Sequence, residues 1–206
     1  MFIIRGFIYL FGLAGIAQCI ALEAFEFGTL AEYSEQSLTE RLQDLFTFSS
    51  SVIFFICAYY SKAYRQACIL LGALTLMMCV RESDSFLDQN VFDGAWQVIV
   101  SIILLAVIFV LRKQFKETYA SLRRFSETSS FGFVATGMVI ILAFSRMMGR
   151  GDLWKALMGD GYVRVVKNVV EEGTELLGYS IVMIAAVELL VFVMATVKKE
   201  RIATAS

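Results

Sequence analysis

Six apolar segments occupy most of this chain and decide what kind of fold it can adopt. An α-helix needs about 20 mainly apolar residues to cross a hydrocarbon core about 30 Å thick. We expect the crossings at about 3–22, 42–61, 66–82, 95–111, 131–146 and 175–197. Because 58% of the 206 residues are hydrophobic, the expected solvent is lipid rather than water. The sequence therefore predicts an all-α polytopic membrane protein, a six-helix bundle that forms a single domain over residues 1–206.

The absence of proline and of histidine limits the helix shapes and the kinds of active site that this chain can form. The chain has no proline, so each span can be a continuous helix. It has no histidine, which removes the commonest ligand for zinc, copper and haem iron and the usual general base at neutral pH. The four cysteines lie singly in apolar runs, without a CxxC pair, at Cys19, Cys57, Cys68 and Cys79. We expect no metal centre and no cofactor; a hard divalent cation at a carboxylate cluster is the alternative.

Basic residues are divided unequally between the two sides of the predicted bundle. One side holds 11 of the 18, accompanied only by Glu117, Glu127 and Glu200. These 11 are Arg5, Lys62, Arg65, Arg112, Lys113, Lys116, Arg123, Arg124, Lys198, Lys199 and Arg201. The other side holds 15 acidic and 7 basic residues. Since cytoplasmic loops carry an excess of lysine and arginine, we expect a multi-pass protein of the bacterial inner membrane with both termini in the cytoplasm. We also expect the first segment to be retained rather than cleaved as a signal.

Local patterns place several helix ends. Residues 37–40 read Ser-Leu-Thr-Glu, the spacing of a capping box, so we expect the second helix to begin near Leu38. The third span is expected to end near residue 82, with Arg81, Glu82 and Asp84 drawn towards the headgroups; in a helix that continued, Arg81, Asp84 and Asp88 would share one face. Residues 152–158 predict a short amphipathic helix along the membrane surface. The last helix is expected to start well before the bilayer.

Polar residues mark five predicted helix ends on the outer side of the membrane. At four of these ends the candidate site residues are Glu40, Gln43, Arg81, Glu82, Asp84, Arg146, Arg150, Glu171, Glu172 and Glu175; Asp93, Trp96 and Gln97 mark the fifth, the start of the fourth span. Ionisable groups brought to one depth can pair, and Arg81 and Arg146 are the expected partners of Glu175. Three interpretations stay open: solvated charges above the headgroups, a structural ion-pair network, or a site for a cation or polar substrate.

Glu188 is a separate case, because it lies 13 residues beyond Glu175 in the middle of an apolar run. That spacing corresponds to about 20 Å along a helix, which places Glu188 near mid-membrane. An ionisable group at this depth usually faces the bundle interior. A hydrogen bond to Ser101, Thr136 or Tyr179 is expected; a proton relay or a contact with another protein's helix is the alternative.

Three motifs, TERLQ (39–43), RESD (81–84) and EEGTELLGY (171–179), carry a resemblance. Together they resemble the ExxQ, RExD and EExxE helix ends of a loosely defined group of small bacterial multi-pass proteins classed as domains of unknown function. The resemblance implies an inner-membrane protein whose outer polar residues matter, and it supplies no activity. A histidine is expected after the RExD motif in that group. This chain has Ser85 and Phe86 there, so no metal or catalytic role is carried over.

These observations favour a non-catalytic accessory, assembly or regulatory membrane component. A small ion- or proton-coupled transporter is the alternative, and a carboxylate-dependent enzyme acting on lipid is a weaker one. No nucleophile elbow or phosphate loop supports an enzyme. The expected partners are the lipid bilayer and another membrane protein or a second copy of the chain. Nucleic acid is not expected, because a basic cytoplasmic loop at residues 112–124 suits anionic lipid.

Overall fold

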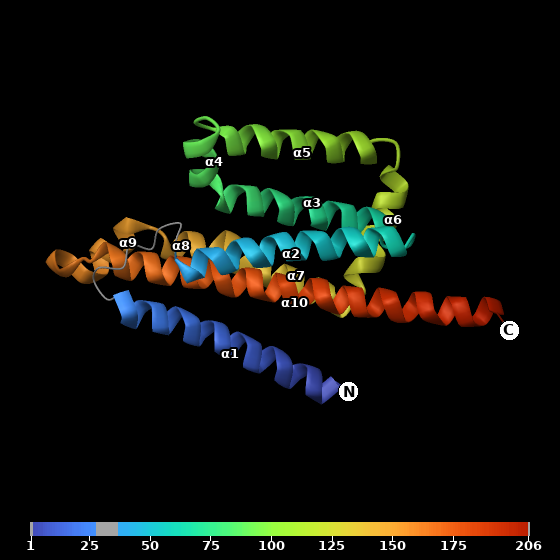
Figure 1. Cartoon of the computed structure of the whole chain (residues 1–206), viewed down its shortest axis with the longest axis horizontal. Helices are drawn as coiled ribbons and strands as arrows, with labels where there is room; N and C mark the ends of the chain where they lie inside the picture. Colours follow the sequence, from blue (N-terminus) through green and yellow to red (C-terminus); the bar gives the residue numbers. More distant parts are fainter. Residues whose placement is uncertain (1, 28–36, 206) are drawn as a thin grey trace. The chain divides into compact units, whose positions relative to one another are not determined.

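The computed structural model describes residues 2–27 and 37–205, and within them the fold is all-α, without a strand (Figure 1). The predicted all-α class is therefore confirmed. In chain order the elements are α1 (Phe2–Phe27), α2 (Leu38–Tyr60), α3 (Arg65–Glu82), α4 (Asp84–Asn90), α5 (Ala95–Leu111), α6 (Phe115–Ser126), α7 (Ser129–Val139), the π-helix η2 (Ile140–Ser145), α8 (Arg146–Met148), α9 (Gly151–Met158), the 3₁₀-helix η3 (Gly159–Gly161) and α10 (Arg164–Ala205).

Four stretches of helix are long and apolar enough to cross a membrane. They are Ile3–Phe25, Leu38–Tyr60, Ser129–Met148 and Arg164–Lys199. Two further pairs of helices pass the same test together but are bent, α3 with α4 by 61° and α5 with α6 by 105°. If each bent pair is one span, the described chain has up to six. All six predicted segments coincide with helices.

Two predicted helix starts agree with the structure. α2 begins at Leu38, where the Ser37 hydroxyl oxygen accepts the Glu40 N–H at 3.1 Å, as a capping residue does. α10 begins at Arg164, well ahead of Glu175. Its 42 residues correspond to about 63 Å at 1.5 Å per residue, about twice the thickness of a hydrocarbon core. The predicted short helix at 152–158 is α9.

Two local features go beyond the predictions. α3 ends at Glu82, as the predicted span 66–82 does, and α4 sets out in a new direction, so Arg81, Asp84 and Asp88 do not share one continuous helix. At the break the Asp84 carboxylate accepts the N–H of Ser85 at 2.6 Å, a side-chain bond that competes with helix hydrogen bonding. The stretch treated as a basic loop, 112–124, instead folds mostly into α6.

The described chain divides into two compact units. The first comprises Met1–Gln43 and Ala135–Ile181, and the second comprises Asp44–Val134 and Val182–Ser206. The boundaries fall within α2, α7 and α10. The single domain expected from the sequence stays a prediction, and each unit is described by itself.

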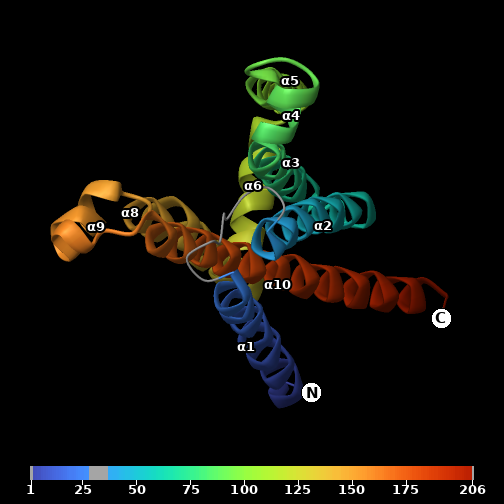
Figure 2. The same ribbon diagram turned by 60° about the vertical axis from the view of Figure 1, so that its left-hand side comes forward.

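The second unit is organised around α3. α3 lies beside α5, and α4 joins their ends (Figures 1 and 2). α2 approaches α3 closely at Gly72: its carbonyl accepts the Ser51 hydroxyl at 2.8 Å, and a Cβ there would lie 3.1 Å from the Phe55 ring. Phe54 and Cys57 are fully buried on α2. Small residues at the crossing allow this contact, as is common between transmembrane helices.

The first unit is organised around the first half of α10. Leu176 and Tyr179 are buried there, and so is Ile141 of η2. α1 contributes little to this core, because no residue in its most apolar 18-residue window is buried. Its contacts lie towards its C-terminal end, where Ile20 comes within 3.4 Å of a Cβ placed on Gly173. Three acidic residues of this unit, Glu171, Glu172 and Glu175, lie on α10.

Candidate functional site

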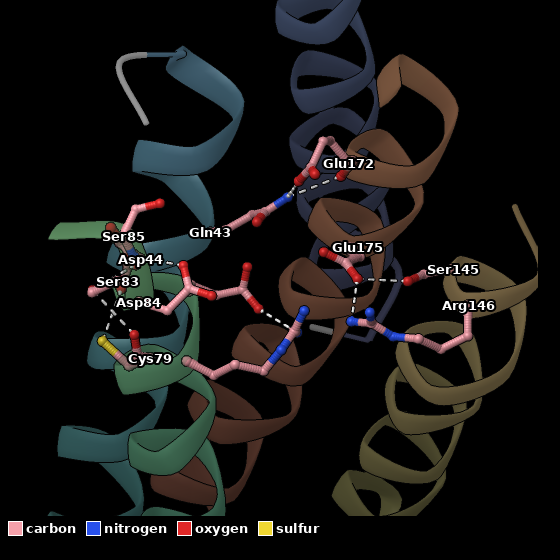
Figure 3. Close-up of polar contacts among 12 residues, drawn as sticks. Gln43, Asp44, Cys79, Ser83, Asp84, Ser85, Ser145, Arg146, Glu172 and Glu175 are labelled. Atoms are coloured by element: carbon pink, nitrogen blue, oxygen red, sulfur yellow. Dashed lines mark hydrogen bonds and ion pairs between the residues drawn. The ribbon is translucent and has the colours of Figure 1, made fainter. Parts of the chain in front are cut away.

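Glu175 is the most deeply buried carboxylate on α10, at 3% exposure. The guanidinium of Arg146 lies 2.6 Å from its Oε1 atom, and the Ser145 hydroxyl donates to the same oxygen at 2.7 Å (Figure 3). The expected ion pair between Arg146 and Glu175 is therefore present. The alternative in which Glu175 is a solvated charge is wrong. A buried carboxylate is tolerated only with such partners, because the surroundings cannot solvate it.

The π-helix η2 delivers both donors to Glu175. Ser145 is its last residue, and Arg146 follows directly. A π-turn takes in one more residue than an α-turn, so it rotates the residues that follow it relative to the preceding helix. Gly178, one turn beyond Glu175, allows the approach, since a Cβ there would overlap Ile141 of η2. The ion pair between Arg146 and Glu175 thus depends on close packing of η2 against α10, which requires glycine at position 178.

Gln43, at the start of α2, bonds the turn of α10 that precedes Glu175. Its side-chain nitrogen donates to the Glu172 carbonyl and to the Glu172 carboxylate, both at 3.0 Å (Figure 3). Gln43 is fully buried. This pair of bonds holds the beginning of α2 against α10, so the ExxQ and EExxE motifs meet through Gln43 and Glu172.

Glu171 completes the acidic side chains on this part of α10. Its carboxylate lies 2.7 Å from the Lys167 ammonium one turn earlier, and both side chains are 18% exposed. Gly149, which ends α8, lies against the same carboxylate so closely that a Cβ would overlap it. We call Glu171, Glu172 and Glu175, with Gln43, Ser145, Arg146 and Lys167, the α10 cluster.

Glu23 belongs to the polar structure of the first unit, and the sequence analysis missed it. It is 6% exposed and lies near the end of α1. Its carboxylate accepts the N–H of Leu38 at 2.7 Å, the N–H of Thr39 at 3.1 Å and the Thr39 hydroxyl at 2.6 Å. A carboxylate suits this place because the first N–H groups of α2 have no partner within the helix. An acidic residue at the end of one span, shortly before a helix start, was the available signal.

The other predicted cluster residues have different surroundings. In the second unit Arg81 and Glu82, neighbours in sequence, form an ion pair at 2.9 Å. Asp84 bonds within its own turn, as described above. Arg150 is exposed at the start of α9. Glu40 lies in the first turn of α2. A meeting of all five helix ends, and a pairing of Arg81 with Glu175, stay predictions.

Asp44 is a second residue that the sequence analysis missed, here in the second unit. Its carboxylate accepts the Ser83 hydroxyl at 3.3 Å, and its backbone carbonyl lies 4.0 Å from the Cys79 thiol (Figure 3). These contacts join α2 to the end of α3. Asp44 directly follows the ExxQ motif (residues 40–43) and is not part of it, so the motif did not identify Asp44 as a site residue.

Glu188, the predicted intramembrane acid, lies on α10 in the second unit. It is 9% exposed, and its neighbours Ala185 and Leu189 are fully buried. Burial agrees with the expectation that it faces other helices rather than lipid. Ser101, one of its expected partners, donates its hydroxyl to the Gln97 carbonyl at 2.7 Å.

Each of the three carboxylates of the α10 cluster has a partner within the chain. Glu175 and Glu171 form ion pairs with Arg146 and Lys167, and Glu172 accepts a hydrogen bond from the neutral Gln43 amide. Among the described residues no group of three or more His, Cys, Asp or Glu side chains could hold a metal ion. Comparison with known proteins gave no matching family model, no similar curated protein and no similar solved structure.

Proposed function

We propose that this chain is an integral protein of the bacterial inner membrane, with six crossings and both termini in the cytoplasm. The four to six helices of membrane-spanning length support this proposal. So does the excess of lysine and arginine in the loops assigned to one side. Reporter fusions after Ile202 and within residues 88–93 test it. A cytoplasmic reporter is expected to be active at the first site and a periplasmic reporter at the second; the reverse pattern contradicts the topology.

Within that membrane, the chain acts as a non-catalytic accessory, assembly or regulatory component that associates with another membrane protein or with a second copy of itself. The observation that carries this proposal is the α10 cluster. Catalytic and ion-binding carboxylates must offer oxygen atoms to a substrate or ion. The Glu175 carboxylate is instead buried against Arg146 and Ser145, and Glu172 is held by Gln43. Such a network fixes the packing of helices and presents a stable outer surface.

Native mass spectrometry of the full-length protein, purified at its normal expression level in a mild detergent, tests the accessory role. A particle of fixed stoichiometry, containing a second membrane protein or a second copy, is expected. Glu175→Ala should weaken this particle because it loosens α10, whereas Glu127→Ala, at an exposed ion pair, should leave it intact. A monomer of uniform mass in every mild detergent tried contradicts the proposal.

A small proton- or ion-coupled transporter is the second candidate, and Glu188 is the observation that favours it. A carboxylate buried in the middle of a span is the kind of group that carries protons or coupling ions in transporters. In proteoliposomes under an imposed pH gradient, the chain would then support a proton flux that Glu188→Gln abolishes. Glu23→Gln is the matched control, since Glu23 is as buried but caps a helix. Equal flux with Glu188→Gln rules out this role for the residue.

A further inference from the structure

The chain turns sharply where α5 ends. α5 and α6 meet at 105°, and only Arg112, Lys113 and Gln114 separate them (Figure 1). If α5 crosses the bilayer, as proposed above, a helix nearly perpendicular to it runs along the membrane surface. The predicted orientation puts this surface on the cytoplasmic side. α6 is therefore placed where lipid headgroups lie.

One face of α6 is fixed to the helix hairpin formed by α2 and α3. The Ser121 hydroxyl accepts the Ala67 N–H at 3.1 Å, and the Arg124 guanidinium donates to the Ala63 carbonyl at 3.4 Å. At the corner the Gln66 side chain donates to the Gln114 side chain at 3.0 Å. Ser121 is buried on this face, at 1% exposure. These bonds determine which side of α6 faces outward.

The outward side carries an apolar stripe. Phe115, Tyr119 and Leu122 follow one another at i, i+4 and i+7, the spacing of a single helix face. They are 83%, 69% and 39% exposed. Three large apolar side chains in a row on a short surface helix are typical of helices that lie in the membrane interface.

Basic side chains border the stripe. At 100° per residue, Lys116 and Arg123 lie beside it, on the side away from the face packed on α3. Both are exposed, and so are Arg112 and Lys113 at the corner. The Arg112 guanidinium lies 4.0 Å from the centre of the Phe109 ring, so it folds back along α5. We call Lys116 and Arg123, together with Arg112 and Lys113 at the corner that precedes α6, the basic face of α6.

We propose that α6 is an interfacial helix that binds anionic phospholipid headgroups. The Phe115–Tyr119–Leu122 stripe enters the boundary between headgroups and acyl chains, and the basic face of α6 binds phosphate oxygens at its edge. The occupant follows from charge, because residues 112–127 carry five cations, Arg124 included, against only Glu117 and Glu127, which directly follows α6. This inference rests on the proposed membrane location and is independent of the accessory role.

Competition between lipids tests the headgroup preference. The full-length protein in a neutral detergent is equilibrated with equal amounts of phosphatidylglycerol and phosphatidylcholine, and bound lipids are counted by native mass spectrometry. The wild-type chain should retain phosphatidylglycerol several-fold over phosphatidylcholine. The Lys116→Gln/Arg123→Gln double variant should lower that ratio to about unity, since each cation near an anionic surface contributes about fivefold and the loss of two removes a several-fold preference. Lys155→Gln/Arg164→Gln, which removes two exposed cations outside α6, is the matched control.

The position of α6 is tested separately by fluorescence. Tyr119→Trp is reconstituted in vesicles that contain brominated phosphatidylglycerol or brominated phosphatidylcholine, and the unchanged chain supplies the background. Stronger quenching by the brominated phosphatidylglycerol is expected. Absence of quenching by both lipids, equal quenching with equal lipid counts, or loss of the preference in excess inorganic phosphate would each overturn the proposal. A monomeric particle would count against the accessory role and leave these results unchanged.

Discussion

Glu175 and Arg123 each belong to an ion pair, but the two pairs lie in very different surroundings. In the α10 cluster Glu175 is 4% exposed by its side chain and lies 2.6 Å from Arg146. On α6, Arg123 is 74% exposed and lies 4.0 Å from Glu127, which is 70% exposed. A buried charge depends on its partner because nothing else solvates it, whereas an exposed one depends on solvent or headgroups. A glutamate–arginine pair therefore holds helices together in the α10 cluster, whereas on α6 it lies at the surface, where solvent or headgroups can replace either partner.

Glu175→Ala should have the largest effect, because it leaves Arg146 and Ser145 without their acceptor. Removing one partner of a buried pair costs about 3–5 kcal/mol, and the half-exposed Arg146 side chain puts the expected loss near the lower end, about 3 kcal/mol. Unfolding in mixed micelles with increasing denaturing detergent measures it. Glu175→Gln, which keeps a hydrogen-bond acceptor, should lose less. Equal stability of Glu175→Ala and the wild type would show that the pair does not hold α10.

Gly178→Ala tests whether the polar contact depends on close packing. The added methyl group would overlap Ile141 of η2, and overpacking of this kind costs about 1–3 kcal/mol. Gly132→Ala is the matched control: Gly132 is also helical, but nothing lies within 4 Å of its Cβ position. That change should be neutral or stabilise the chain by up to about 1 kcal/mol. The same unfolding measurement compares the two, and equal effects would contradict the packing argument.

Much of the architecture could be predicted because hydropathy is a local property of the sequence. The apolar stretches that coincide with helices and the start of α2 at Leu38 follow from runs of residues and a capping pattern that neighbours alone determine. The pairing of Arg146 with Glu175 was accessible because few cations lie on the predicted outer side. By contrast, the contact of Glu23 with Leu38 and Thr39 depends on how the end of α1 lies against the start of α2. No local pattern specifies that placement.

The π-helix and α4 show a second limit of sequence reasoning. η2 replaces ordinary α-helical bonds with a wider turn, and Gly178 on another helix provides the space for it. A register change that depends on a distant partner leaves no periodic signal in the sequence. The end of the third span near residue 82 was predicted, but the separate helix α4 was not: Asp84 bonds the next N–H and starts it in a new direction. Side-chain competition for backbone groups was the physical cause in this case.

Thr39→Val tests how much a single hydrogen bond to a buried carboxylate contributes. It removes the Thr39 hydroxyl that donates to Glu23 and keeps the two backbone N–H donors. A hydrogen bond of this kind contributes about 1 kcal/mol, so a loss of about that size is expected. Thr196→Val is the matched control, since its hydroxyl bonds the Phe192 carbonyl on an exposed part of α10. Thermal unfolding in one detergent measures both. If Thr196→Val lowered stability as much as Thr39→Val does, the buried hydrogen bond to Glu23 would contribute no more than an exposed one.

Glu127→Gln should have the smallest effect on stability. It removes the ion-pair partner of Arg123, but the pair is long and both side chains face outward. Exposed pairs of this kind contribute about 0.2–1 kcal/mol, and the 4.0 Å separation favours a value below about 0.5 kcal/mol. Because the change also removes a negative charge beside the basic face of α6, it should raise the retention of phosphatidylglycerol in the lipid competition. A loss of stability comparable to that of Glu175→Ala would mean that burial does not separate the two regions, and the contrast between them would fail.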